Sequence, residues 1–127
     1  MPHVTIECSA NVGQITDLDQ LAAALHAAAI ATGVAPLDAL RTRVVVHDRY
    51  VIADALPENK FIAVSGRFLQ GRSIDDKQRL VGALMDALVT HLGDAERDIA
   101  LSVEYQEIDP ATRLNRNSLQ ARTRITS

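Results

Sequence analysis

The sequence predicts an α+β fold, a two-layer α/β sandwich in which duplicated β-α-β units form a four-stranded sheet with two helices on one face. Two β-rich segments are each followed by a helical apolar stripe and then by another β-rich segment. This order repeats at an offset of about 60 residues, so that Gly33 is matched by Gly93 and Leu21 by Leu80. The repeat is one of pattern rather than of identity, and it predicts two equivalent halves.

The first strand is expected directly after Pro2, where polar and apolar side chains alternate. One face carries the apolar side chains Val4, Ile6 and Cys8, and the other carries His3, Thr5 and Glu7. The strand is expected to give way between Ala10 and Gln14. A strand at this place would hold Pro2 rigidly at the edge of a sheet.

The first helix is expected to start near Leu18, with Thr16 or Asp17 as its cap, and to end at Thr32-Gly33. Its apolar stripe consists of Leu18, Leu21, Ala22, Leu25, Ala28 and Ala29. Pro36 prevents an immediate return to helix, and a β-branched run between Leu40 and Asp48 predicts the second strand. A helical crossover makes the first two strands parallel and their connection right-handed.

The second half repeats this order after an irregular stretch from Arg49 to Asn59. A strand from Lys60 to Leu69 leads to a helix that Ser73 can cap, with Asp76 three residues later. The apolar stripe of this helix consists of Leu80, Val81, Leu84, Leu88 and Leu92. Gly93 ends the helix, and the last strand presents Ile99, Leu101, Val103 and Tyr105 on one face.

The chain of 127 residues fits a single domain, residues 1–127, with halves at about 2–58 and 59–108. The tail, residues 109–127, is polar, and its only large apolar residues are Leu114, Leu119 and Ile125. Such a tail cannot cover the sheet face that the helices leave free. We therefore expect the free sheet faces to pack together in a homo-oligomer.

Composition excludes several classes of protein. A formal net charge of -3 and a pI near 5.7 argue against binding to nucleic acid or to an anionic membrane surface. One cysteine excludes an intrachain disulfide, and no apolar run is long enough to span a bilayer. A cytoplasmic location is expected. The four histidines lack metal-ligand spacing, so a metal site is not expected: His3, His26, His47 and His91.

Several local motifs resemble the 5-carboxymethyl-2-hydroxymuconate isomerase family from Pro2 to about Asn117. The motifs are Pro-His-Val-Thr-Ile-Glu-Cys-Ser after Met1, Ala31-Thr32-Gly33-Val34-Ala35-Pro36-Leu37, Arg41-Thr42-Arg43, Ala53-Asp54 and Gly71-Arg72-Ser73. This family belongs to the tautomerase superfamily, which includes 4-oxalocrotonate tautomerase and MIF-like proteins. The resemblance implies a duplicated β-α-β fold, a homotrimer, and an amino-terminal proline that acts as the acid-base catalyst without a cofactor.

Pro2 is the catalytic residue that the resemblance implies. An ordinary α-amino group has a pKa of roughly 7.7–8.0, and burial together with nearby guanidinium charges would lower the pKa of a proline amine toward neutrality. One such base can take a proton from oxygen or carbon and return it to a different carbon. The interpretation requires removal of Met1, because the Pro2 nitrogen is otherwise an amide without a usable lone pair.

The implied substrate, a small molecule from homoprotocatechuate catabolism, carries three carboxylates, which favours guanidinium partners. Arg72 lies at the turn into the second helix, where free N-H groups also favour an anion. Arg41 is a second candidate that a neighbouring subunit can supply. Arg43 lies two residues further along the same strand face, and the resemblance leaves open which of the two reaches the substrate.

Other interpretations of these residues compete with this one. The chain can be a non-catalytic trimeric binding module, or a superfamily enzyme that hydrates or tautomerises another small keto acid. Asp75 or Asp76 can pair with Arg72. Cys8 is expected to be a packed thiol. Glu7 and Tyr50 are equally consistent with lining the pocket and with packing at a strand edge.

Overall fold

The computed structural model describes residues 2–119, so Met1 and the predicted tail residue Ile125 lie outside the described residues. Four strands form one sheet: β1 (His3–Ser9), β2 (Arg41–His47), β3 (Lys60–Leu69) and β4 (Ile99–Ile108). The two α-helices are α1 (Leu18–Ala31) and α2 (Ile74–Leu92). Short 3-10 turns follow β1, α2 and β4, at Ala10–Gln14, Gly93–Ala95 and Pro110–Thr112.

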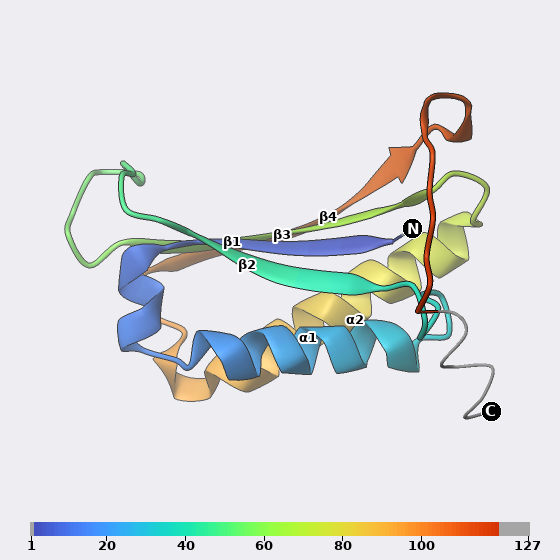
Figure 1. The fold of residues 1–127 in the computed structure, drawn as a ribbon. Helices are drawn as coiled ribbons and strands as arrows, with labels where there is room; N and C mark the ends of the chain where they lie inside the picture. The colour runs from blue at the N-terminus through green and yellow to red at the C-terminus, as the bar shows by residue number, and fades with distance from the viewer. Residues whose placement is uncertain (1, 120–127) are drawn as a thin grey trace.

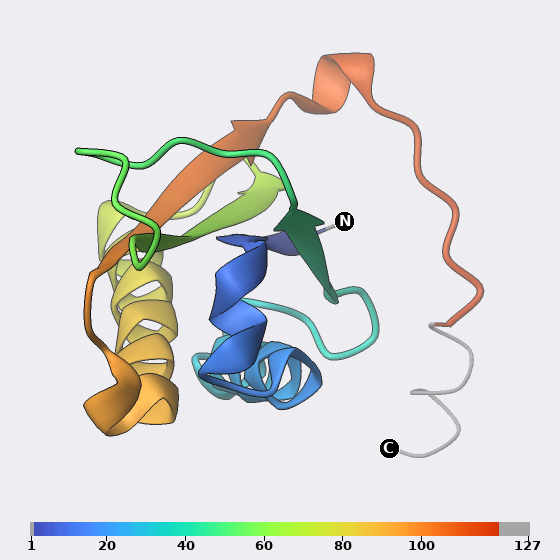
Figure 2. The ribbon, with the colours of Figure 1, turned by 90° about the vertical axis from the view of Figure 1, so that its left-hand side faces the viewer.

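The sheet is mixed, with strand order β2-β1-β3-β4. β1 is parallel to β2 and β3 is parallel to β4, while the two central strands β1 and β3 are antiparallel. Each parallel pair is joined through a helix, and both helices pack on the same side of the sheet (Figures 1 and 2). This architecture confirms the predicted fold class and the parallel pairing of the first two strands.

The helix boundaries follow from capping residues. The Asp17 side chain accepts a hydrogen bond from the Gln20 amide at 3.0 Å, which decides between the two predicted caps of α1. The Ser73 hydroxyl accepts from the Asp76 amide at 3.1 Å and caps α2, as predicted. Both helices end next to a glycine with positive φ, Gly33 at 76° and Gly93 at 53°.

The core lies between the sheet and the helices. Its strand residues are fully or almost fully buried, namely Val4, Ile6, Cys8, Ile62, Val64 and Phe68. The helices contribute Leu21, Leu25, Ala29, Leu80, Leu84, Leu88 and Leu92. Val81, which was predicted in the same stripe, is only partly buried. Burying an aliphatic side chain of this size contributes about 1.5–3 kcal/mol, so the core depends on many modest contributions.

The opposite side of the sheet, here called the open face, is not covered by either helix (Figure 2). It carries the alternate side chains of the strands, including His3 and Glu7 of β1, Arg41 and Arg43 of β2, and Arg67 of β3. Arg41, Arg43 and Arg67 are exposed. Within residues 2–119, no helix combines the length and the apolar character that crossing a bilayer requires.

Candidate active site

Pro2 lies buried at the start of β1 and lines a cavity of about 230 Å³, here called the Pro2 cavity. The Pro2 carbonyl accepts a hydrogen bond from the Arg41 amide at 3.2 Å, which ties the start of β1 to the start of β2. The described lining residues come from three further segments of the chain and are Pro36, Ala39, Leu69, Arg72, Arg113 and Asn115. The cavity therefore forms where the start of β1, the α1-β2 connection, the end of β3 with the turn after it, and the C-terminal segment meet.

Arg72 shares this cavity with Pro2 and is held there by main-chain acceptors. Its Nη1 donates to the Leu69 carbonyl at 3.1 Å, and its Nη2 donates to the Val34 carbonyl at 3.2 Å. The predicted competition from acidic neighbours is not seen among residues 2–119, since Asp76 pairs with Arg79 at 2.8 Å. A guanidinium has five N-H donors, so Arg72 keeps donors for an anion.

In Figure 1 the C-terminal segment runs along the end of the molecule at which β1 starts. The Asn117 side chain donates to the Asp38 carbonyl at 2.8 Å and attaches this segment to the α1-β2 connection. Arg113 and Asn115, which precede this attachment, line the Pro2 cavity. The sequence analysis missed both residues, because an arginine in a polar tail has no periodic signal that predicts its return to the sheet.

Arg41 and Arg43 lie outside the described lining of the Pro2 cavity, on the open face around His3. Arg41 Nη1 is 3.4 Å from His3 Nε2, and Arg43 Nη1 is 3.1 Å from His3 Nδ1. Burial and the charges of Arg43, Arg41 and Arg67 lower the pKa of His3. The two strand arginines therefore share one face, as predicted, and this face is distinct from the cavity that contains Arg72.

The other residues considered in the sequence analysis lie outside the described lining of the Pro2 cavity. Glu7 Oε1 lies 3.0 Å from His47 Nε2, and the two residues form an ion pair when His47 is protonated. Tyr50 lines a different cavity, together with other residues of the loop before β3 that include Val51 and Pro57. Cys8 is fully buried, and burial raises the pKa of its thiol, which agrees with a packed side chain.

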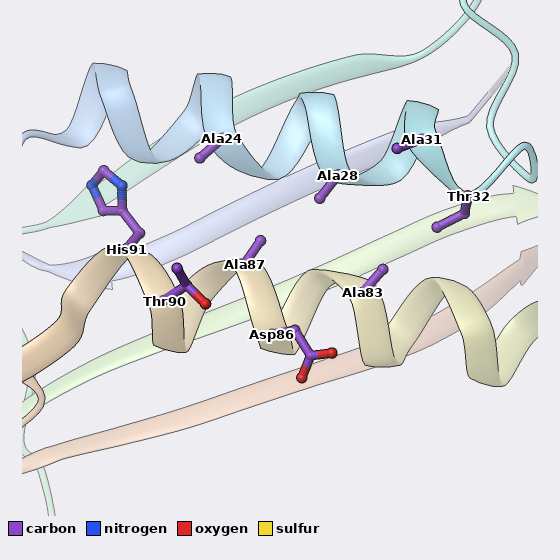
Figure 3. Close-up of a pocket in the computed structure, with 9 residues that line it drawn as sticks. All are labelled: Ala24, Ala28, Ala31, Thr32, Ala83, Asp86, Ala87, Thr90 and His91. Carbon is purple, nitrogen blue, oxygen red and sulfur yellow. The ribbon is translucent and has the colours of Figure 1, made fainter.

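A larger groove, of about 570 Å³, lies between α1 and α2 in the helical layer. Figure 3 shows alanines of α1, including Ala24 and Ala28, across from Ala83 and Ala87 of α2. Its polar side chains come from Thr32, Asp86, Thr90 and His91. Among the described residues, the groove shares no lining residue with the Pro2 cavity and has no guanidinium group that could bind a carboxylate.

Solved structures with the same architecture define the class of this protein. A 5-carboxymethyl-2-hydroxymuconate isomerase from Deinococcus radiodurans R1 superposes with a TM-score of 0.88, is 27% identical, and is matched over 96% of this chain and 93% of its own. A fused 4-OT described as a wild-type symmetric trimer superposes at 0.65 with 17% identity, over 90% of this chain and 93% of its own. The fold is that of the tautomerase superfamily.

The particular family follows from the sequence comparisons. The sequence profile of the 5-carboxymethyl-2-hydroxymuconate isomerase family matches residues 2–123. The 5-carboxymethyl-2-hydroxymuconate Delta-isomerase of Escherichia coli is 31% identical over 123 residues, which cover 95% of this chain and 98% of the E. coli protein. The chain belongs to the 5-carboxymethyl-2-hydroxymuconate isomerase family and is an isomerase, which confirms the resemblance and favours the enzyme over the binding module.

Proposed function

We propose that the mature protein starts at Pro2 and uses this nitrogen as the acid-base group that isomerises 5-carboxymethyl-2-hydroxymuconate. The observation that carries the proposal is that Pro2 and Arg72 line one cavity. The relatives from E. coli and D. radiodurans are isomerases named for this compound. Since the compound is an unsaturated product of aromatic-ring cleavage, the reaction would belong to the catabolism of aromatic compounds.

The chemistry needs one base and no second reactant. The neutral amine of Pro2 takes the proton from the enol hydroxyl of the substrate, and the electron pair of the O-H bond forms the ketone. The conjugated double bonds shift, and the ammonium returns the same proton to a carbon atom of the diene. Atoms and electrons therefore balance within the substrate, and the amine is regenerated.

The cavity supports this chemistry electrostatically. Burial and the guanidinium charge of Arg72 both disfavour a protonated amine, and so they favour the form of Pro2 that accepts a proton. Arg72 is fixed by two main-chain carbonyls, so it is preorganised to bind a substrate carboxylate and to stabilise enolate-like charge. Arg72 is thus a proposed carboxylate ligand in the same cavity as the reacting amine.

A homotrimer is the assembly that we propose for this protein. Its support is the open face, on which Arg41, Arg43 and Arg67 are exposed, and the trimeric state of the fused 4-OT neighbour. Arg41 and Arg43 lie on this face and outside the described lining of their own Pro2 cavity. In a trimer, one of them would bind a carboxylate in the cavity of the adjacent subunit.

The test is the rate of ketonisation of 5-carboxymethyl-2-hydroxymuconate, followed by ultraviolet absorbance. Mass spectrometry first establishes that the protein used begins at Pro2. Pro2→Ala and Arg72→Ala are each expected to lower kcat/KM by about 100-fold, because the first replaces a rigid secondary amine by a mobile primary one and the second removes a fixed charge. A chain that retains Met1 is the matched control, because it keeps every side chain while its Pro2 nitrogen is an amide and not an amine. Full activity of that control, or of both variants, would refute the assignment.

A further inference from the structure

We propose that Arg113 is a second carboxylate ligand of the Pro2 cavity, delivered by the C-terminal segment. The inference rests on the proposed function, because it assigns to Arg113 a carboxylate of the substrate that reacts at Pro2. Arg113 lines the cavity together with Pro2 and Arg72. The two guanidinium groups would then bind different carboxylates of one polycarboxylate.

An unsatisfied donor is the first observation that points to a ligand. Nη2 of Arg113 is buried and has no hydrogen-bond partner among residues 2–119. Buried polar atoms of folded proteins are nearly always paired, and an unpaired donor on a charged group is particularly unfavourable. Arg72 provides the contrast, because two of its nitrogens are paired with main-chain carbonyls. Because Nη2 is closed off from solvent, the guanidinium would turn toward the cavity when a carboxylate binds there, and it would then gain an acceptor that residues 2–119 do not supply.

The charge of the cavity is the second observation. Its described lining includes two arginines, Arg72 and Arg113, and no acidic side chain. Two like charges that share one partly enclosed cavity repel each other, and this repulsion is relieved when an anion binds between them or beside each of them. The cavity is therefore complementary to a ligand with more than one carboxylate.

The segment that carries Arg113 is held on both sides. Before it, the Asp109 carboxylate accepts a hydrogen bond from the Ala111 amide at 2.9 Å and caps a short 3-10 turn. After it, the Asn117 side chain donates to the Asp38 carbonyl at 2.8 Å and accepts from the Leu119 amide at 2.9 Å. These contacts fix the backbone on either side of Arg113, so Asn117 is a positioning residue for the guanidinium.

Arg113→Gln tests the proposal, with Arg116→Gln as the matched control. Arg116 lies on the same segment, is exposed and does not line the Pro2 cavity, so its substitution removes the same charge without removing a cavity donor. We expect Arg113→Gln to raise the KM for 5-carboxymethyl-2-hydroxymuconate about 10-fold or more, as expected for a lost charge-assisted hydrogen bond. Arg116→Gln should change it less than about twofold.

Thermal stability separates a ligand role from a structural role. Because Nη2 of Arg113 is unpaired within the described part of the chain, Arg113→Gln should keep or raise the Tm. Arg113→Lys should recover part of the lost affinity, since it restores the charge but not the planar fork. The proposal is overturned by a KM of Arg113→Gln within about twofold of wild type, by an equal effect of Arg116→Gln, or by a lower Tm that accounts for the loss.

A binding measurement keeps the two proposals distinguishable. Propane-1,2,3-tricarboxylate is added to each protein, and the rise in Tm is recorded without any turnover. The rise should be smaller for Arg113→Gln than for Arg116→Gln, and equal shifts, including no shift in either, overturn the role of Arg113. If the shifts differ while the wild-type protein fails to ketonise the substrate, Arg113 is an anion ligand and the proposed reaction is wrong.

Discussion

The guanidinium of Arg72 lies over the ring of Phe68, with 5.0 Å between Cζ and the ring centroid. Phe68 is fully buried in β3, so this contact joins the Pro2 cavity directly to the core. The main-chain carbonyls of Leu69 and Val34 hold the same guanidinium from two other segments. Arg72 is therefore oriented by its planar shape as well as by its charge.

Arg72→Lys is expected to behave as a severe substitution. Lysine has no planar fork to bridge the two carbonyls and a carboxylate, so we expect kcat/KM for ketonisation to fall by about 10- to 100-fold. Steady-state kinetics measure this change. Arg79→Lys is the control, because Arg79 pairs with Asp76 on the exposed side of α2, and its activity should match wild type. A fully active Arg72→Lys protein would show that the fork is unnecessary.

Mixed trimers test whether Arg41 and Arg43 act across the subunit interface. Pro2→Ala subunits are unfolded and refolded together with subunits that carry both Arg41→Ala and Arg43→Ala. In an equal mixture, about one quarter of the sites would combine an intact Pro2 with intact arginines from the neighbour, so activity should reappear. If the mixed trimers are no more active than trimers of the Pro2→Ala protein alone and of the double-arginine variant alone, the arginines do not act on a neighbouring site.

His3 makes the stability of the folded protein depend on pH. Burial and then Arg43, Arg41 and Arg67 lower its pKa from the usual 6.5, so the unfolded chain binds a proton more readily than the folded one. Stability should therefore fall as the pH drops below about 6.5, and His3 should have no effect well above that pH. Thermal unfolding from pH 7.5 to 5 should show this loss for wild type, and a smaller loss for His3→Gln. If the Tm of the two proteins falls equally between pH 7.5 and 5, His3 is not the source of the pH dependence.

The helix-sheet core sets most of the stability. Leu84 is fully buried, so Leu84→Ala is expected to lower the free energy of unfolding by about 2–5 kcal/mol. Leu114→Ala removes the same atoms at a position that is 101% exposed, so it should change that free energy by less than about 0.5 kcal/mol. Urea unfolding of the two variants gives the comparison, and equal effects would contradict the observed packing.

The sequence predicts this fold well because its signals are local. Alternating polarity identifies the strands, and the capping residues Asp17 and Ser73 and the glycines Gly33 and Gly93 mark the ends of the helices. The antiparallel pairing of β1 with β3 has no such signal, because it joins segments about 60 residues apart. Near this pairing, the Asn11 side chain donates to the Asn59 carbonyl at 2.8 Å, and no sequence pattern predicts this contact.

The candidate site likewise contains residues that local motifs predict and a residue that they do not. Pro2 and Arg72 stand in short motifs, and the structure brings both of them to one cavity. Arg113 stands in no motif, and its position depends on the contact between Asn117 and Asp38, residues that are 79 apart in the sequence. A contact between residues so far apart in the sequence depends on the tertiary structure, and local sequence patterns do not predict it.

The duplicated fold has two equivalent strand starts, one at β1 and one at β3. At the second start, the nitrogen of Asn59 is an internal amide that donates to the Leu56 carbonyl at 3.1 Å. Duplication and fusion of a β-α-β unit doubles the strands and helices, but the fused chain still has one amino terminus. A base that is the amino-terminal amine is therefore not duplicated with the fold. Each chain therefore holds one proposed catalytic amine, because its other two amines, Lys60 and Lys77, are lysine side chains in β3 and α2.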